Sequence, residues 1–466
     1  MNKFPKNFLW GASTSAYQIE GCVEEGGKVT STMDLYGDKP SYPKGITGFK
    51  EASQHYKYWK TDVEMMAKMG LKSYRFSISW PRIIKDKNGS VNQEGIKYYN
   101  DLIDELLKYN IEPIVTMFHF DIPLFVMKDG GVHDKNFVKH FELYSEVLLK
   151  HFGSKINYWL TINELNILVM MADGFEILEK QDLSKQLKVL HNLNLAQAKA
   201  IIKCKEICPS AKIGPAPNIA TVYSDTCKPE DYTAKLNIEM IRNWVYLDAV
   251  CKGKYSNIFI KFVKKMGVDF EVTKDDLDTL AKGKPDFIAF NYYTTMTAQM
   301  PTEESIKENK EKFDQQKGLV VPGFGMATKN PNLQKTEFGW EIDPVGFKNT
   351  LREVYDRYDL PVMITENGIG ARDELTKDGK IHDDYRIYYY KQHIRQLAEA
   401  ISDGVEVIGY MPWSAIDLVS THEGISKRYG FIYVNRDEFD LKDMKRIEKD
   451  SYYWYKNLIE VNGENI

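Results

Sequence analysis

PVMITENG, residues 361–368, is an apolar run of strand character that ends on the carboxylate of Glu366. Valine, isoleucine and methionine are typical of a strand buried inside a parallel sheet, and Gly368 lets the chain turn away. A carboxylate at the end of such a strand is costly to desolvate unless other groups use it or compensate its charge. Glu366 is therefore the first candidate for a functional side chain.

Similar apolar runs recur along the chain, and helical patterns separate them. Apolar residues at three- and four-residue spacing predict helices at 52–70, 92–110, 135–152, 184–207 and 451–463, with further helical patterns at 231–265. The eight predicted strands cover residues 8–14, 73–80, 111–120, 156–164, 211–219, 286–294, 361–367 and 405–414.

Eight strands separated by helices predict an α/β fold, a single (β/α)8 TIM barrel with long βα loops, as one catalytic domain over residues 1–466. Parallel neighbours need crossover helices, and in a barrel the eighth strand can pair with the first. The alternative is an open doubly wound sheet that binds a dinucleotide. No glycine-rich phosphate fingerprint follows the first strand, which argues against that alternative.

The segment 295–342 carries the charged run EESIKENKEKFDQQK. Such a run is typical of a solvated helix or a disordered flap. A mobile lid over the cleft is the alternative interpretation.

Composition and charge exclude several classes of partner. The net charge is −4 and the pI is near 6.2, so no nucleic acid or anionic membrane is expected to bind. The N-terminus lacks the apolar stretch of a signal peptide, and no window approaches the roughly 20 apolar residues of a membrane span. The five cysteines form an odd number without metal-ligand patterning, which fits reduced thiols. We therefore expect a cytoplasmic protein, and a homo-oligomer is compatible with its sequence.

In a TIM barrel the polar residues at the carboxyl ends of the strands converge on one mouth, where active sites lie. Two glutamates at such positions, Glu164 and Glu366, each stand beside an asparagine. A single glutamate there is more often a structural ion-pair partner, but two form an acid/base pair. The polar or aromatic residues at these strand ends are Gln18, Arg75, His119, Asp121, Asn163, Glu164, Asn291, Tyr293, Glu366 and Trp413.

A facing pair of carboxyl groups suits the cleavage of a glycosidic bond. One protonated carboxyl gives a proton to the leaving oxygen, and one carboxylate attacks or stabilises the oxocarbenium-like centre. Each charge suppresses ionisation of the other, so one proton tends to stay on the pair. Arg75 is placed to hold Glu366 ionised, and Tyr293 to donate to the same oxygen. Carboxyl groups and water suffice for this chemistry, so we expect no metal and no organic cofactor.

Five motifs make the chain resemble glycoside hydrolase family 1 from residue 4 to residue 463. They are FLWGASTSAYQIEG at 8–21, FHFD at 118–121, TINEL at 161–165, NYY at 291–293 and ITENG at 364–368. The resemblance implies that Glu164 is the general acid/base and Glu366 the nucleophile of a double displacement with retention. It also implies glycone-binding roles for Gln18, His119, Asn163 and Asn291, a sugar platform at Trp413 and an aglycone-side tryptophan at Trp340.

The segment DLVSTHEGISKRYGFIYVN, residues 417–435, follows the last strand and bears on the sugar. Its Ser420, Lys427 and Tyr429 resemble the phosphate-binding set of the 6-phospho-β-glycosidase branch. A phosphoryl dianion favours an ammonium and hydroxyl donors. Thr421 stands where galactose-specific members carry tryptophan, so it resembles the glucosidase side.

These residues predict a retaining enzyme that hydrolyses 6-phospho-β-D-glucosides, such as cellobiose 6-phosphate, to glucose 6-phosphate and an aglycone. The alternatives are a 6-phospho-β-galactosidase and a β-glucosidase or β-galactosidase that acts on unphosphorylated sugars. A glycan-binding protein on a degenerate barrel is a third alternative, against which the two intact glutamates argue.

Overall fold

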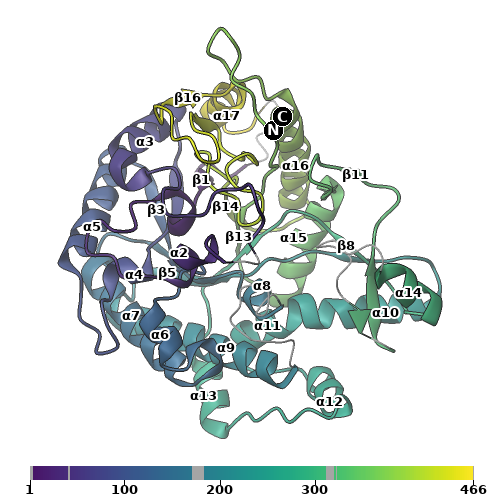
Figure 1. Cartoon of the computed structure of the whole chain (residues 1–466). Helices are drawn as coiled ribbons and strands as arrows, with labels where there is room; N and C mark the ends of the chain where they lie inside the picture. The colour runs from purple at the N-terminus through teal and green to yellow at the C-terminus, as the bar shows by residue number, and fades with distance from the viewer. Residues whose placement is uncertain (1–3, 40–41, 171–182, 311–319, 322, 465) are drawn as a thin grey trace.

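The computed structural model describes residues 4–39, 42–170, 183–310, 320–321, 323–464 and 466, and it shows a ring of helices around a central sheet (Figure 1). The sheet has eight parallel strands in the order β5-β4-β3-β2-β1-β14-β13-β7. Their bounds are Leu9–Ser13 (β1), Ser73–Ser77 (β2), Glu112–Phe118 (β3), Tyr158–Asn163 (β4), Lys212–Ala216 (β5), Ile288–Asn291 (β7), Val362–Glu366 (β13) and Val407–Tyr410 (β14).

The two ends of this sheet meet. Asn218, just past β5, forms a parallel bridge with Asn291 of β7, whose backbone N–H donates to Pro217 O at 2.9 Å. The sheet therefore closes into the predicted (β/α)8 barrel. Its interior holds a separate apolar cluster drawn from six strands or their ends: Ile114, Leu160, Ala216, Phe287, Ala289, Met363 and Met411.

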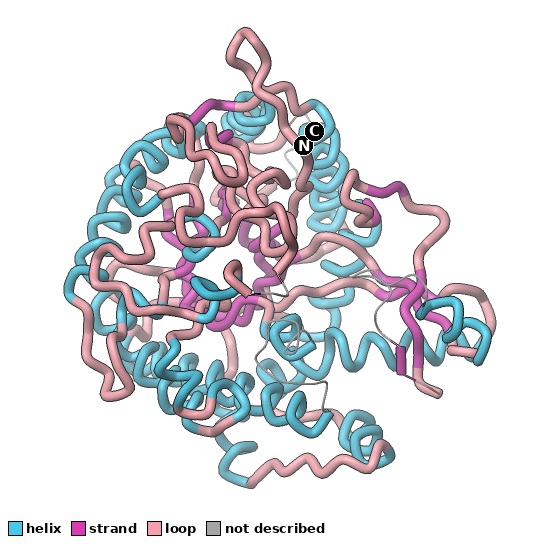
Figure 2. Tube along the Cα trace, in the orientation of Figure 1, coloured by secondary structure: helices cyan, strands magenta, loops and turns pink. Residues whose placement is uncertain are grey.

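The helices cover the outside of the barrel, as the tube view shows (Figure 2). The predicted ones are α3 (His55–Met69), α5 (Gln93–Lys108), α7 (Asn136–Phe152), α9 (Leu183–Ile207) and α17 (Asp450–Glu460). The 231–265 pattern is divided into α10 (Pro229–Glu239), two short π-helical turns around α11 (Val245–Leu247), and α12 (Asn257–Lys265). Two helices that the sequence analysis leaves unassigned flank β13, namely α15 (Pro344–Tyr358) and α16 (Asp384–Ser402).

Several predicted strands extend too far at their carboxyl ends. The predictions 73–80, 286–294 and 405–414 correspond to Ser73–Ser77, Ile288–Asn291 and Val407–Tyr410. Aromatic and apolar residues continue past each strand, so the sequence pattern does not show where the ladder stops. Among these extra residues are Tyr293 and Trp413, which lie past the strands at the mouth of the barrel, and Trp413 keeps an isolated parallel bridge with Ser13.

The segment 295–342 contains more regular structure than expected. Residues Glu303–Lys310 form α14, and its Glu303, Glu304 and Lys307 are exposed, which confirms a solvated helix there. Residues 311–317 of the charged run lie outside the described residues. A small sheet joins β6 (Val222–Ser224), β8 (Met296–Gln299), β10 (Gly325–Thr328) and β9 (Val320–Val321), and β11 (Gln334–Lys335) pairs with β12 (Glu341–Ile342).

None of the helices in the described part of the chain is long and apolar enough to cross a bilayer. All five cysteines are free thiols.

Candidate active site

Glu366 ends β13 and lies between donors from β2 and from the segment that follows β7. Arg75 Nη1, on β2, donates to Glu366 Oε1 at 2.6 Å, and Tyr293 OH donates to Glu366 Oε2 at 2.7 Å. The buried Arg75 is itself fixed, because its Nε donates to Thr116 Oγ1 at 2.8 Å. Both predicted donors therefore contact Glu366, but the prediction that they share one oxygen is wrong, because each donates to a different oxygen of the carboxylate.

Burial raises the pKa of the Glu366 carboxyl to about 7. The Arg75 charge and the Tyr293 hydrogen bond lower this pKa, whereas the charge of Glu164 raises it. Burial outweighs the two donors. The carboxyl group is thus poised to change protonation state near neutral pH, which is a common property of functional groups.

Asn163, at the end of β4, connects the surrounding side chains. Its Oδ1 accepts from Arg75 Nη2 at 2.7 Å and from Asn291 Nδ2 at 3.1 Å. Its Nδ2 lies 3.0 Å from His119 Nε2. Burial and the Arg75 charge lower the pKa of His119, so the imidazole is neutral, and its buried Nδ1 has no partner among the described residues. A ring nitrogen left in this way is suited to a ligand hydroxyl.

Glu164 follows Asn163 and faces the same network. Its Oε1 accepts from Asn291 Nδ2 at 3.0 Å and from Asn218 Nδ2 at 2.8 Å. Its backbone has φ = 44°, in the left-handed region that a non-glycine residue rarely adopts. Strained backbone of this kind gathers at functional sites.

Asn218 and Arg242 belong to this site and were not predicted. Arg242 Nη2 donates to Asn218 Oδ1 at 2.5 Å, which orients the amide that contacts Glu164. Asn218 is the second-last residue of the predicted strand 211–219. Because polar residues at the carboxyl ends of barrel strands are candidates for the active site, this position could have been included from the sequence. Arg242 lies in a helical segment where no local pattern distinguishes it.

Ser420, Lys427 and Tyr429 form a second group on the segment after β14. Ser420 and Tyr429 share a side-chain hydrogen bond, and burial raises the pKa of Tyr429. Lys427 Nζ lies over the Trp340 ring, and that ring packs against Tyr293, the donor to Glu366. The second group therefore lies next to the first.

Aromatic rings surround the Lys427 ammonium. Its Nζ lies 4.1 Å from the centre of the Trp340 ring and 4.4 Å from that of Phe338. Burial lowers the pKa of Lys427 to about 8, and no carboxylate in the described ranges forms an ion pair with it. A buried cation in this position gains stability when an anion binds beside it.

The remaining predicted residues line the same region. The Trp413 ring stacks on His119 at 6.0 Å, and the Trp340 ring packs against Tyr293 at 5.5 Å. Gln18 Nε2 donates to Val419 O at 2.9 Å, beside Ser420. Direct contacts thus join the predicted site residues to one another, and Gln18 is joined to them through the short loop that carries Ser420.

Comparisons with known proteins give one consistent family. Residues 1–464 match the model described as glycosyl hydrolase family 1. The chain is 42% identical over 475 residues to aryl-phospho-beta-D-glucosidase BglC of Bacillus subtilis, covering 99% of this chain and 98% of that protein. It is 36% identical over 477 residues to phospho-cellobiase of Klebsiella oxytoca, covering 100% of both chains.

A solved structure agrees with the fold. The family 1 β-glucosidase from Thermotoga maritima superimposes with a TM-score of 0.89 at 34% identity, covering 99% of both chains. The fold is therefore shared with an enzyme that is named a β-glucosidase.

Proposed function

The chain belongs to glycosyl hydrolase family 1, and from this premise we propose that it hydrolyses 6-phospho-β-D-glucosides to glucose 6-phosphate and an aglycone. The observation that carries the proposal is the Lys427 ammonium, which is buried without a carboxylate partner among the described residues and lies near Ser420 and Tyr429. A phosphoryl dianion supplies the missing charge, and the two hydroxyl groups can donate to its oxygens. BglC and phospho-cellobiase carry names that include the phosphorylated sugar, which supports the same substrate class.

The proposed mechanism is a double displacement with retention. Glu366 attacks the anomeric carbon while Glu164 gives a proton to the leaving oxygen, and a water activated by Glu164 then hydrolyses the glycosyl ester. Arg75 and Tyr293 support the ionised form of Glu366, and Asn218 orients the Glu164 carboxyl. We also propose that the Glu164 and Glu366 carboxyl groups lie about 5 to 5.5 Å apart, as retention requires.

Gln18, His119, Asn163 and Asn291 are proposed to bind the hydroxyl groups of the phosphorylated sugar ring. Trp413 is proposed as the platform under that ring, and Trp340 as a wall on the aglycone side. These roles are supported by the contacts that join the residues to one another and to Glu366.

Thr421 supports the gluco rather than the galacto epimer. Thr421 follows Ser420 directly, and its side chain is small and polar. Its Oγ1 lies 3.0 Å from the Tyr17 hydroxyl oxygen. A tryptophan there would fill this space.

We further propose that residues 1–466 form one catalytic domain that works in the cytoplasm. Trp10 Nε1 donates to Asn462 Oδ1 at 2.9 Å, so residues near the two ends of the chain pack together in the same barrel (Figure 1). A sugar phosphate is charged and does not diffuse across a membrane, so an enzyme that acts on it has to share its compartment.

The test is to compare kcat/KM for an aryl 6-phospho-β-glucoside with kcat/KM for its unphosphorylated parent. We expect the phosphorylated substrate to be favoured by about 100-fold or more, because a desolvated charge pair is worth several kcal/mol. Equal values would refute the proposal. The aryl 6-phospho-β-galactoside, measured alongside, tests the choice of epimer.

Tyr293→Phe should shift the acid side of the pH profile. Glu366 has to be ionised to attack, so kcat/KM of the natural protein should rise as the pH increases through about 7. Removing the Tyr293 donor raises the pKa of Glu366, so the rise should move upward by about one pH unit. The substrate phosphoryl group titrates identically with both proteins, and an unchanged profile would contradict the role given to Tyr293.

Gly370→Ala should weaken binding of the phosphorylated substrate. A Cβ on Gly370 would lie 2.7 Å from Lys427 Cγ and 2.8 Å from Tyr429 Cζ, so both side chains would have to shift. We expect KM for the aryl 6-phospho-β-glucoside to rise by about 10-fold, since small displacements of positioned groups are costly. KM for the unphosphorylated parent is the control and should change far less, because that substrate has no phosphoryl group to bind beside Lys427.

A further inference from the structure

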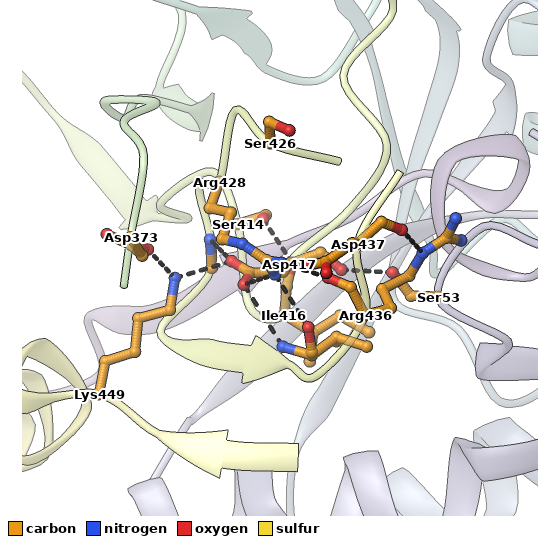
Figure 3. Close-up of polar contacts among 12 residues, drawn as sticks. Ser53, Asp373, Ser414, Ile416, Asp417, Ser426, Arg428, Arg436, Asp437 and Lys449 are labelled. Carbon is orange, nitrogen blue, oxygen red and sulfur yellow. Dashed lines mark hydrogen bonds and ion pairs between the residues drawn. The ribbon is translucent and has the colours of Figure 1, made fainter. Parts of the chain in front are cut away.

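A chain of buried ion pairs lies behind the segment that carries Lys427. Arg428 Nη1 donates to Asp417 Oδ2 at 2.8 Å, and Lys449 Nζ donates to Asp417 Oδ1 at 2.7 Å (Figure 3). Lys449 also binds Asp373, which Arg386 Nη2 contacts at 3.1 Å. The six members alternate in sign, and their side chains are at most 5% exposed: Arg428, Asp417, Lys449, Asp373, Arg386 and Asp383.

Asp417 connects this network to the backbone of the segment that carries Lys427. Besides the two cations, its carboxylate accepts from the backbone N–H of Gly430 at 3.0 Å and of Val434 at 3.4 Å. Arg428 donates in addition to Val434 O at 2.9 Å and Arg436 O at 2.6 Å. Asp417 and Arg428 together thus bind the backbone of Gly430, Val434 and Arg436, and Figure 3 shows Arg428 beside Asp417.

Arg428 lies between the two residues proposed to bind phosphate, Lys427 and Tyr429. Its backbone forms an isolated antiparallel bridge with Ala371, with hydrogen bonds of 2.9 Å and 3.0 Å, so Arg428 itself is extended, next to a bend at Lys427. In extended backbone, successive side chains point to opposite sides. Arg428 points into the ion-pair network, whereas Lys427 and Tyr429 point toward the Trp340 and Ser420 side. Fixing Arg428 therefore fixes both neighbours.

We propose that Asp417 is a positioning residue for phosphate selection, which rests on the proposed function. Asp417 is fully buried and its carboxylate is occupied by protein donors, so it acts through Arg428 and Gly430 and not by touching the substrate. A network that served stability alone would affect all substrates alike. A positioning role predicts that its disruption impairs the phosphorylated substrate selectively.

The test measures kcat and KM of Asp417→Asn with an aryl 6-phospho-β-glucoside and with its unphosphorylated parent. We expect the ratio of the two kcat/KM values to fall by about 10- to 100-fold, mainly through KM of the phosphorylated substrate, because displaced contacts cost that much. Arg428→Lys keeps the charge but loses the forked contacts, and it should lower the same ratio. If Asp417→Asn does not fold, the ratio measured with Arg428→Lys tests the positioning role instead.

Asp62→Asn is the matched control. Asp62 is also fully buried and accepts from an arginine, Arg446 Nε at 2.7 Å, but it has no contact with residues 420–430 in the described structure. It should lower the melting temperature and leave the ratio unchanged. If Arg428→Lys keeps the ratio of the natural protein, the inference is overturned while the proposed function stands. A natural protein without preference for the phosphorylated substrate would refute both.

Discussion

Glu366→Ala should lower kcat for an aryl 6-phospho-β-glucoside by roughly 10⁴- to 10⁶-fold, the range seen when a covalent nucleophile is removed. The covalent intermediate cannot form without the carboxylate, and the Arg75 and Tyr293 donors lose their common partner. Measuring kcat with an activated leaving group gives the loss directly.

Azide should then restore cleavage of the activated substrate by Glu366→Ala. The truncated side chain leaves room for a small anion near Arg75, and attack from that face gives the α-glycosyl azide. Glu112→Ala is the control, since Glu112 begins β3 at the opposite end of the barrel. Hydrolysis that continues without Glu366, or a β-configured azide product, would contradict the assignment.

Lys427→Ala should raise KM for the aryl 6-phospho-β-glucoside by about 100-fold, because losing one partner of a desolvated charge pair costs about 2–5 kcal/mol. The unphosphorylated parent should be affected far less, since it has no charge to pair with the ammonium. Steady-state kinetics with both substrates gives the comparison, and Lys442→Ala, an exposed lysine paired with Asp437, is the control.

The pH dependence of KM for the phosphorylated substrate is a second test of the role of Lys427. The pKa of Lys427 is lowered to about 8, so raising the pH through that value neutralises the ammonium and should raise KM for the phosphorylated substrate. Lys427→Ala should remove this alkaline change. A KM that stays constant up to pH 9 in the natural protein, or equal losses on both substrates in the variant, would contradict the phosphate role of Lys427.

The barrel could be predicted because its strands are buried on both faces, so runs such as PVMITEN are continuously apolar. Glu164 and Glu366 could be predicted as site residues for a related reason, because each is a charged residue at the end of a predicted strand. The short strands β8 and β10 were missed, because four residues beside a long charged run give no clear alternation.

Contacts between distant segments could not be predicted. Asn218 and Glu164 are 54 residues apart, and their hydrogen bond depends on how β4 and β5 align. The Asp417 network joins the loop after β13, the segment after β14 and the start of α17. Charged residues are common in all three segments, so only the folded structure shows which of them pair.

The most direct measurement is mass spectrometry of the protein after reaction with a 2-deoxy-2-fluoro-β-glucosyl fluoride that carries a 6-phosphate. The fluorine slows hydrolysis of the ester, so the glycosyl-enzyme should accumulate. We predict one adduct with the mass of the phosphorylated fluorosugar, located on the peptide that contains Glu366, and much slower labelling by the unphosphorylated reagent. Labelling of another residue, or equal rates with both reagents, would contradict the account.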